Sequence, residues 1–210
     1  MTLAASRRTV ACAFALLALG GCAGTAPQYY SLADAAAVTA PAATSGAAAF
    51  YIDLAPVAMP ERFARPQLVV RQKGANEGPA VDILEQHRWS SSFESELRDA
   101  LASGVAMRLG AVDATRSGRP AGQPGVRIAV QLRQFDAIEG SRVDAAFSWT
   151  LRPGNDQPTR ACQLTLSEPA AAPGIDALAR SAQRVTSRLA DAVARSIGTP
   201  PGLTSGACPA

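Results

Sequence analysis

The chain has 210 residues, with 20 basic and 17 acidic side chains, one histidine and four cysteines. This length suits one compact domain. The formal net charge of +3 falls to +1 once Arg7 and Arg8, the two basic residues of the first 21, are set aside. A balance this close to zero gives no indication of a nucleic-acid partner.

A signal peptide is predicted over residues 1–21. Arg7 and Arg8 precede an uncharged, mostly apolar run from Thr9 to Leu19, and two glycines follow it. A basic segment, an apolar segment and small residues in this order are typical of secretion. The run is also shorter than the roughly 20 apolar residues of a membrane-spanning helix. The N-terminus therefore predicts export.

Cys22 follows Leu19-Gly20-Gly21 directly and resembles the modified cysteine of bacterial lipoproteins. The resemblance implies cleavage before Cys22, a diacylglycerol on its thiol and an N-acyl chain on its amino group, with no other cofactor. Ala23, in place of an Asp, implies the outer membrane, on its periplasmic face. The alternative is a plain secretory signal with an incidental cysteine.

Residues 22–49 are predicted to be a lipidated N-terminus and a tether. The short aromatic patch from Tyr29 to Leu32 has the composition to add an edge strand. The segment from Ala33 to Ala49 is almost entirely Ala, Thr, Pro, Ser and Gly and lacks the apolar periodicity of a packed element.

The folded domain is predicted over residues 50–198, starting with a half-buried strand from Phe50 to Ala55. A loop and a hairpin follow, the hairpin formed by Gln67 to Arg71 and Val81 to Leu84 around a turn at 73–79. Apolar residues then recur every four positions from Trp89, which predicts an amphipathic helix from His87 to Leu109 that ends at Gly110.

Three consecutive antiparallel strands and a second helix complete the domain. The strands are expected at 126–133, 143–152 and 162–167, with turns at 139–141 and 155–158. The second helix is expected from Ile175 to Ile197, closed by Gly198, and residues 199–210 form a tail. The expected fold is α+β, a mostly antiparallel sheet with both helices on one face and the other face open to water or a partner.

Cysteine usage points to one disulfide. Cys12 leaves with the signal peptide and Cys22 is the lipid site, so Cys162 and Cys208 remain. Two thiols in an oxidising compartment favour a bond that would tie the tail to the domain. The alternative is two free thiols, with Cys162 buried.

No catalytic or metal-binding set emerges from the sequence. His87, the single histidine, is interpreted as a surface or capping residue, and no G-x-S-x-G motif accompanies it. The sequence has no C-x-x-C, H-E-x-x-H or calcium-loop pattern. We therefore expect no enzymatic activity and no metal.

Several segments, in one order along the chain, resemble the ABC-type transport auxiliary lipoproteins, the PqiC family. The longest runs from Ile52 to Val69 and contains a strand, a Pro-Val-x-x-Pro loop and an Arg-Pro-Gln strand start. The other segments are Tyr29 to Leu32, Arg88-Trp89, Leu101 to Leu109, Phe135-Asp136, and Ala146 to Leu151 with Trp149. The resemblance covers about residues 27–197, while the Ala/Pro-rich segment and the Cys208 tail depart from it.

The resemblance implies a role beside MCE-type lipid transporters. The lipoprotein would be the outer-membrane subunit, an anchored receptor that docks a periplasmic MCE-domain protein and its inner-membrane permease complex. It would act as a homo-oligomer and without a reaction of its own. The rivals are a free-standing structural or peptidoglycan-associated lipoprotein, a lipid carrier with an apolar cavity and, last, a secreted hydrolase.

The loop after the first strand is the candidate partner contact. Exposed, proline-rigid loops that carry arginine and an aromatic residue suit interfaces. The alternative is that the prolines end one strand and position the next. The candidate contact residues are Pro56, Pro60, Arg62, Phe63, Arg65 and Pro66.

Overall fold

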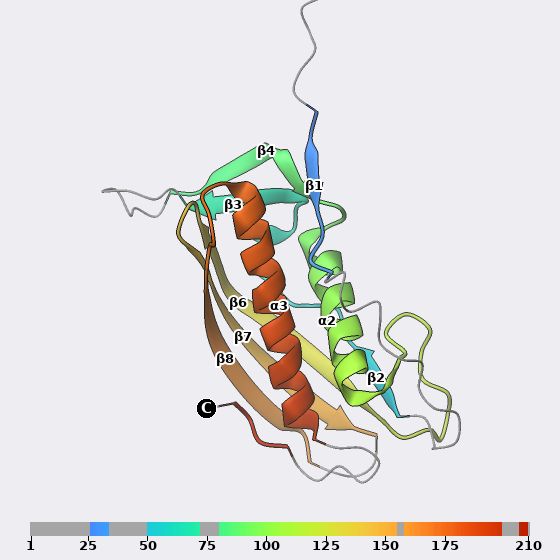
Figure 1. The fold of residues 1–210 in the computed structure, drawn as a ribbon. Coiled ribbons are helices and arrows are strands. Elements are labelled where there is room, and N and C mark those ends of the chain that lie inside the picture. Colours follow the sequence, from blue (N-terminus) through green and yellow to red (C-terminus); the bar gives the residue numbers. More distant parts are fainter. Residues whose placement is uncertain (1–25, 34–49, 72–79, 155–157, 199–205, 210) are drawn as a thin grey trace, which may run out of the picture.

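The computed structural model describes residues 26–33, 50–71, 80–154, 158–198 and 206–209. They form one mixed, mostly antiparallel sheet with two α-helices on one of its faces, which confirms the α+β class (Figure 1). The predicted signal peptide, Cys22, the turn at 73–79 and residues 155–157 of the second turn lie outside the described residues.

The sheet has eight strands in the described part of the chain. They are β1 Gln28–Tyr30, β2 Tyr51–Leu54, β3 Gln67–Arg71, β4 Asp82–Trp89, β5 Val112–Asp113, β6 Gly125–Ile138, β7 Arg142–Pro153 and β8 Arg160–Pro169. The helices are α2, Phe93–Leu109, and α3, Ile175–Ile197, and a 3-10 turn, η3, spans Glu61–Phe63.

The antiparallel meander of β6, β7 and β8 forms as predicted. Its alternating apolar residues face the helices and are buried, among them Ile128, Phe147 and Leu166. Gly140 turns the chain between β6 and β7 at a φ of 61°, a left-handed conformation that glycine adopts without steric cost. Local alternation was therefore sufficient to place these strands.

The remaining strands make the sheet mixed. The expected hairpin of β3 and β4 is antiparallel, but β2 and β3 both run parallel to β6, along different parts of it. β1 adds the predicted edge strand, parallel to β4. The period of two that identifies a strand says nothing about the direction of its neighbour, so these parallel pairings were not predictable from alternation.

The first helix begins later than predicted. Trp89 and His87 belong to β4, and α2 starts at Phe93, after three serines. Ser92 is the N-cap, because its side chain accepts a hydrogen bond from the backbone N–H of Ser95. Trp89 continues the four-residue apolar spacing of the helix but reaches the core from the end of a strand.

The two helices lie side by side over the sheet, with α3 covering β6, β7 and β8 (Figure 1). Gly104 of α2 allows the close approach, since a Cβ there would lie 3.0 Å from the Cβ of Ala190 in α3. Trp149 is buried beneath α3, and its indole N–H donates to the Ser196 hydroxyl at 3.0 Å. This packing closes the core.

The structure corrects the expected role of the Ala/Pro-rich segment. β1 lies in the sheet and Leu32 is buried in the core, so the chain has already joined the domain before residue 34. Residues 34–49 therefore connect two parts of the folded domain. They do not separate the domain from Cys22.

Candidate functional site

The described residues contain no group of three or more His, Cys, Asp and Glu side chains that could hold a metal ion. Among the same residues, no helix is both long and apolar enough to cross a membrane. The remaining candidates for a partner contact lie on the surface. They are the loop before β3 and the open face of the sheet.

The only histidine lies in a polar cluster that fastens β1 to the domain. The Tyr30 hydroxyl lies 2.9 Å from Nδ1 of His87 and donates to Oδ1 of Asp176, at the start of α3, at 2.7 Å. Partial burial, and then the hydrogen bond and the charge of Asp176, raise the pKa of Tyr30 to about 12. Tyr30 therefore keeps its proton at neutral pH, and its contacts join β1 to β4 and to the start of α3.

Replacement of Tyr30 by phenylalanine is expected to reduce stability by about 1 kcal/mol at neutral pH, because a hydrogen bond to a carboxylate is lost. A raised pKa gives stability that is complete below pH 10 and is lost as the pH rises toward 12. Denaturant unfolding between pH 9 and 12 should therefore show a steeper loss in the unsubstituted protein than in Tyr30→Phe. Parallel pH profiles would contradict the assignment.

The backbone of the candidate contact loop is held against the middle of β6. Ala58 donates to the carbonyl of Val130 at 3.1 Å, and its own carbonyl accepts from Leu132 at 2.8 Å. The N–H of Val57 donates to Oε1 of Glu94, in the first turn of α2, at 2.8 Å. These hydrogen bonds give the loop a fixed shape. Such a shape is expected both if the loop is a partner contact and if its prolines only end β2 and position β3.

The structure corrects one candidate contact residue. Phe63 is 4 % exposed and packs against Phe93 and Phe135, with ring centroids 6.0 Å away in both cases. It is a core residue because η3 turns its side chain inward. Of the other candidates, Pro56, Arg62 and Pro66 are exposed, and Pro60 and Arg65 are half-buried.

The loop carries two arginines, exposed Arg62 and half-buried Arg65, together with exposed Glu61. The Arg62 guanidinium carbon lies 4.5 Å from the centroid of the Phe63 ring, a cation–π contact that orients an exposed charge. Among the buried side-chain nitrogen and oxygen atoms of the described residues, Nε of Arg65 lacks a hydrogen-bond partner. This nitrogen is itself buried, so it does not form part of the surface that a partner would contact.

The open face of the sheet is polar. Gln131, Ser148 and Gln163 lie opposite one another across β6, β7 and β8, and all are exposed or half-buried. Such a face can remain in water or meet a hydrophilic partner. Across these three strands, the polar side chains at these positions do not need to be covered by another element.

Charged pairs cross the same face nearer the end of β6. Asp136 and Asp144 are register partners, and each binds an arginine at 2.7 Å, Arg71 and Arg142 respectively. Burial acts to raise the pKa of Asp136, but hydrogen bonds from Arg71 and Gln134 outweigh it and lower the pKa. Asp136 is therefore ionised at neutral pH, and the pairs are structural.

The cavities are small. A hollow of about 20 Å³, lined by apolar residues that include Trp89 and Phe135, lies between the sheet and α3. That is close to the space of one water molecule. A second hollow of about 210 Å³ lies between α2 and α3, below the roughly 300 Å³ of usual ligand sites. Neither hollow supports the lipid-carrier alternative.

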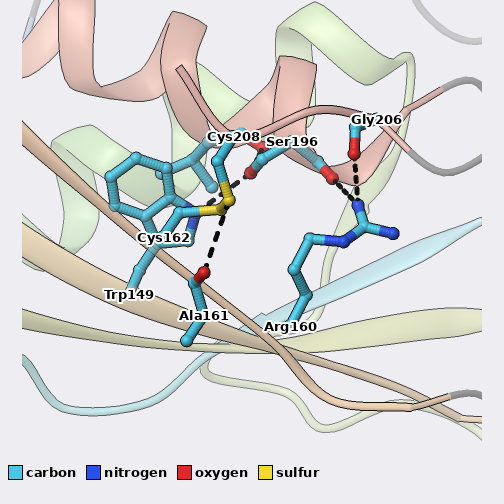
Figure 2. Close-up of a disulfide and its surroundings, with 8 residues drawn as sticks. Trp149, Arg160, Ala161, Cys162, Ser196, Gly206 and Cys208 are labelled. Atoms are coloured by element: carbon cyan, nitrogen blue, oxygen red, sulfur yellow. Dashed lines mark hydrogen bonds between the residues drawn. A yellow bond between two sulfur atoms is a disulfide. The ribbon is translucent and has the colours of Figure 1, made fainter. Parts of the chain in front are cut away.

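Cys162 and Cys208 form a disulfide that joins the tail to β8 (Figure 2). Cys162 is buried, 7 % exposed, and faces Trp149 across β7 and β8. Arg160 supports the same junction, because its guanidinium donates to the carbonyls of Ser196 and Gly206, both at 2.6 Å. The end of α3, the tail and the sheet edge are thus held together.

Sequence reasoning missed the polar groups that link distant elements. Glu168 of β8 binds Arg184 and Arg188, which lie one turn apart on α3. The hydrogen bond from Arg188 is the main cause that lowers the pKa of Glu168, against the effect of burial. The four-residue spacing of the arginines was visible, but their partner lies in another element and only the fold identifies it.

Comparisons with known proteins agree with this architecture. A solved structure described only as an uncharacterized protein aligns with a TM-score of 0.63 and 17 % identity, covering 82 % of this chain and 99 % of that one. Protein XCC0632 from Xanthomonas campestris, described with the family model DUF330, aligns with a TM-score of 0.51 and 13 % identity, covering 79 % and 88 %. At these identities the likeness shows the fold.

Among curated proteins, none matches the sequence. A family model does match, over residues 30–194, and its description is ABC-type transport auxiliary lipoprotein component. The match spans every described element from the end of β1 into α3. The chain therefore belongs to the ABC-type transport auxiliary lipoprotein family.

Proposed function

We propose that the protein is the outer-membrane subunit of an MCE-type lipid transport system, held by acyl chains on Cys22. Family membership over residues 30–194 is the observation that carries the proposal. The subunit docks a periplasmic MCE-domain protein, which in turn is joined to an inner-membrane permease complex. It acts as a homo-oligomeric receptor and not as an enzyme.

The surface of the domain is consistent with a docking role. The two hollows described above, of about 20 and 210 Å³, are too small for a phospholipid chain. The backbone of the loop before β3 is held against β6, and the loop presents an exposed Arg62 beside an exposed Glu61. We place the partner contact on this loop and expect carboxylates or carbonyls on the partner.

Binding of purified partners tests the proposal. Mature protein without acyl chains is mixed with the periplasmic MCE protein encoded by a neighbouring gene. The affinity between the two proteins is measured by biolayer interferometry. In parallel, the natively lipidated protein is recovered from crosslinked cells and its companions are identified by mass spectrometry. Recovery of peptidoglycan or unrelated envelope proteins, with no MCE protein, would support the free-standing alternative.

Arg62→Glu is expected to weaken this binding by about tenfold or more, the usual loss when a central interface arginine is removed. The matched control is Arg116→Glu, which removes an exposed arginine paired with Asp99 instead. The control should bind within about twofold of the unsubstituted protein. Equal affinities for both variants would show that the partner contact does not include Arg62 of this loop.

A further inference from the structure

The N-terminal strand determines which part of the domain lies next to the anchor. The described chain begins at Ala26, four residues after Cys22, and β1 begins at Gln28. An extended chain spans at most about 3.6 Å per residue, so Cys22 stays within roughly 15 Å of Ala26. Acyl chains on Cys22 would therefore hold the start of β1 close to the bilayer surface.

Three exposed apolar side chains lie at this corner of the sheet. Tyr29 is 62 % exposed, Ile83 of β4 is 43 % exposed, and Val81, directly before β4, is 41 % exposed. β1 and β4 are hydrogen-bonded neighbours, with Tyr29 opposite Arg88, and they lie together at one end of the domain (Figure 1). An apolar cluster with a tyrosine is typical of a protein surface that meets a membrane interface.

The charges on β4 are those of Asp82, Glu85 and Arg88, so this strand carries more acidic than basic side chains. Arg88 lies 3.4 Å from the carboxylate of its neighbour Glu85. No excess of positive charge therefore selects an anionic surface, and the contact depends on apolar side chains. We expect it to be insensitive to salt.

We propose that Tyr29, Val81 and Ile83 form a membrane-facing corner that inserts into the headgroup region of the bilayer beside Cys22. The inference depends on the lipid anchor of the proposed function and adds a defined orientation to it. Acyl chains supply retention, because burial of their methylene groups in the bilayer is favourable, and the corner sets which side of the domain faces the lipid.

The orientation has a consequence for docking. The carbonyl of Pro66, at the end of the candidate contact loop, accepts a hydrogen bond from the N–H of Trp89 at 2.7 Å. Trp89 is the register partner of Tyr30, so this end of the loop lies beside the membrane-facing corner. A partner bound to the loop would thus be held close to the membrane surface.

Tryptophan reporters test the corner in the full, acylated protein. Ile83→Trp is reconstituted into vesicles of phosphatidylethanolamine and phosphatidylglycerol that contain a lipid brominated near its carbonyl groups. The native Trp89 and Trp149 are 5 % and 1 % exposed, and the unsubstituted protein gives their background. The additional emission of Ile83→Trp should be quenched at least about twofold, as expected for a side chain at the headgroup boundary.

Val112→Trp is the matched control. Val112 is 40 % exposed, similar to Ile83, and lies just after the C-terminal end of α2. Trp89, at the end of β4, contacts Phe93 at the N-terminal end of the same helix, so the length of α2 separates Val112 from β4. A helix of 17 residues is about 25 Å long, so this reporter should remain in water and unquenched. Thermal unfolding of both variants verifies that they fold.

The outcomes separate the anchor from the corner. An intact mass that includes the acyl chains, with quenching confined to Ile83→Trp, supports both. Acylated protein in which neither reporter is quenched, or both are quenched equally, overturns the membrane-facing corner and leaves the anchor in place. Protein without acyl chains overturns the anchor, and the corner with it.

Discussion

Cys22→Ser is expected to abolish membrane attachment, the largest effect that a single substitution should have on this protein. Three acyl chains would be lost, and each buried methylene contributes about 0.8 kcal/mol to membrane binding. No helix in the described part of the chain offers a second means of crossing the bilayer. The substituted protein should carry no acyl mass and should no longer be found in the outer-membrane fraction.

Fractionation and intact mass measure this effect together. The unsubstituted protein should sediment with outer membranes and carry the mass of a diacylglycerol and an N-acyl chain on a chain that begins at Cys22. Cys12→Ser is the control, because Cys12 lies within the predicted signal peptide and its loss should change neither result. A Cys22→Ser protein that still sediments with outer membranes and carries the acyl mass would show that the lipoprotein interpretation is wrong.

Cys208→Ser is expected to lower the Tm by roughly 8–16 °C. The disulfide closes a loop with a sequence separation of 46 residues, and loop-closure entropy for this length corresponds to about 4 kcal/mol. For a domain of this size, 1 kcal/mol changes the Tm by about 2–4 °C. The tail would then be held at Gly206 by Arg160, without a covalent bond.

Thermal unfolding with and without reductant checks the disulfide. Reductant should lower the Tm of the unsubstituted protein to that of Cys208→Ser. The double variant Cys162→Ser, Cys208→Ser serves as the control, since it should match the single variant and show no response to reductant. An unchanged Tm in Cys208→Ser would mean that the bond contributes nothing to stability.

Elements whose burial follows a local period were predictable. The alternation in β6, β7 and β8 and the apolar stripe of α3 were visible in the sequence, because each residue faces either the core or water at a fixed repeat. The loop between β2 and β3 also lies where the sequence predicted a loop, while its role as a contact stays a prediction. The hydrogen bonds between the backbone of this loop and β6, and the inward direction of the Phe63 side chain, were not predictable from the sequence. Both depend on β6, an element about 70 residues away.

Boundaries were harder where two patterns overlap. Trp89 has the spacing of the α2 stripe, and only the Ser92 cap shows that the helix begins after it. The polar links between Tyr30, His87 and Asp176 gave no periodic signal, because a hydrogen bond between distant elements leaves no repeat in the sequence.

The sequence by itself determined the α+β class, the order of strands and helices, the order of family segments and the expected lipid site at Cys22. The tertiary structure alone decided that β1 joins β4 ahead of the Ala/Pro-rich segment, which brings the domain close to its expected anchor. The physical reason is that three residues are too short to show a period, and their place depends on the exposed edge that another strand offers.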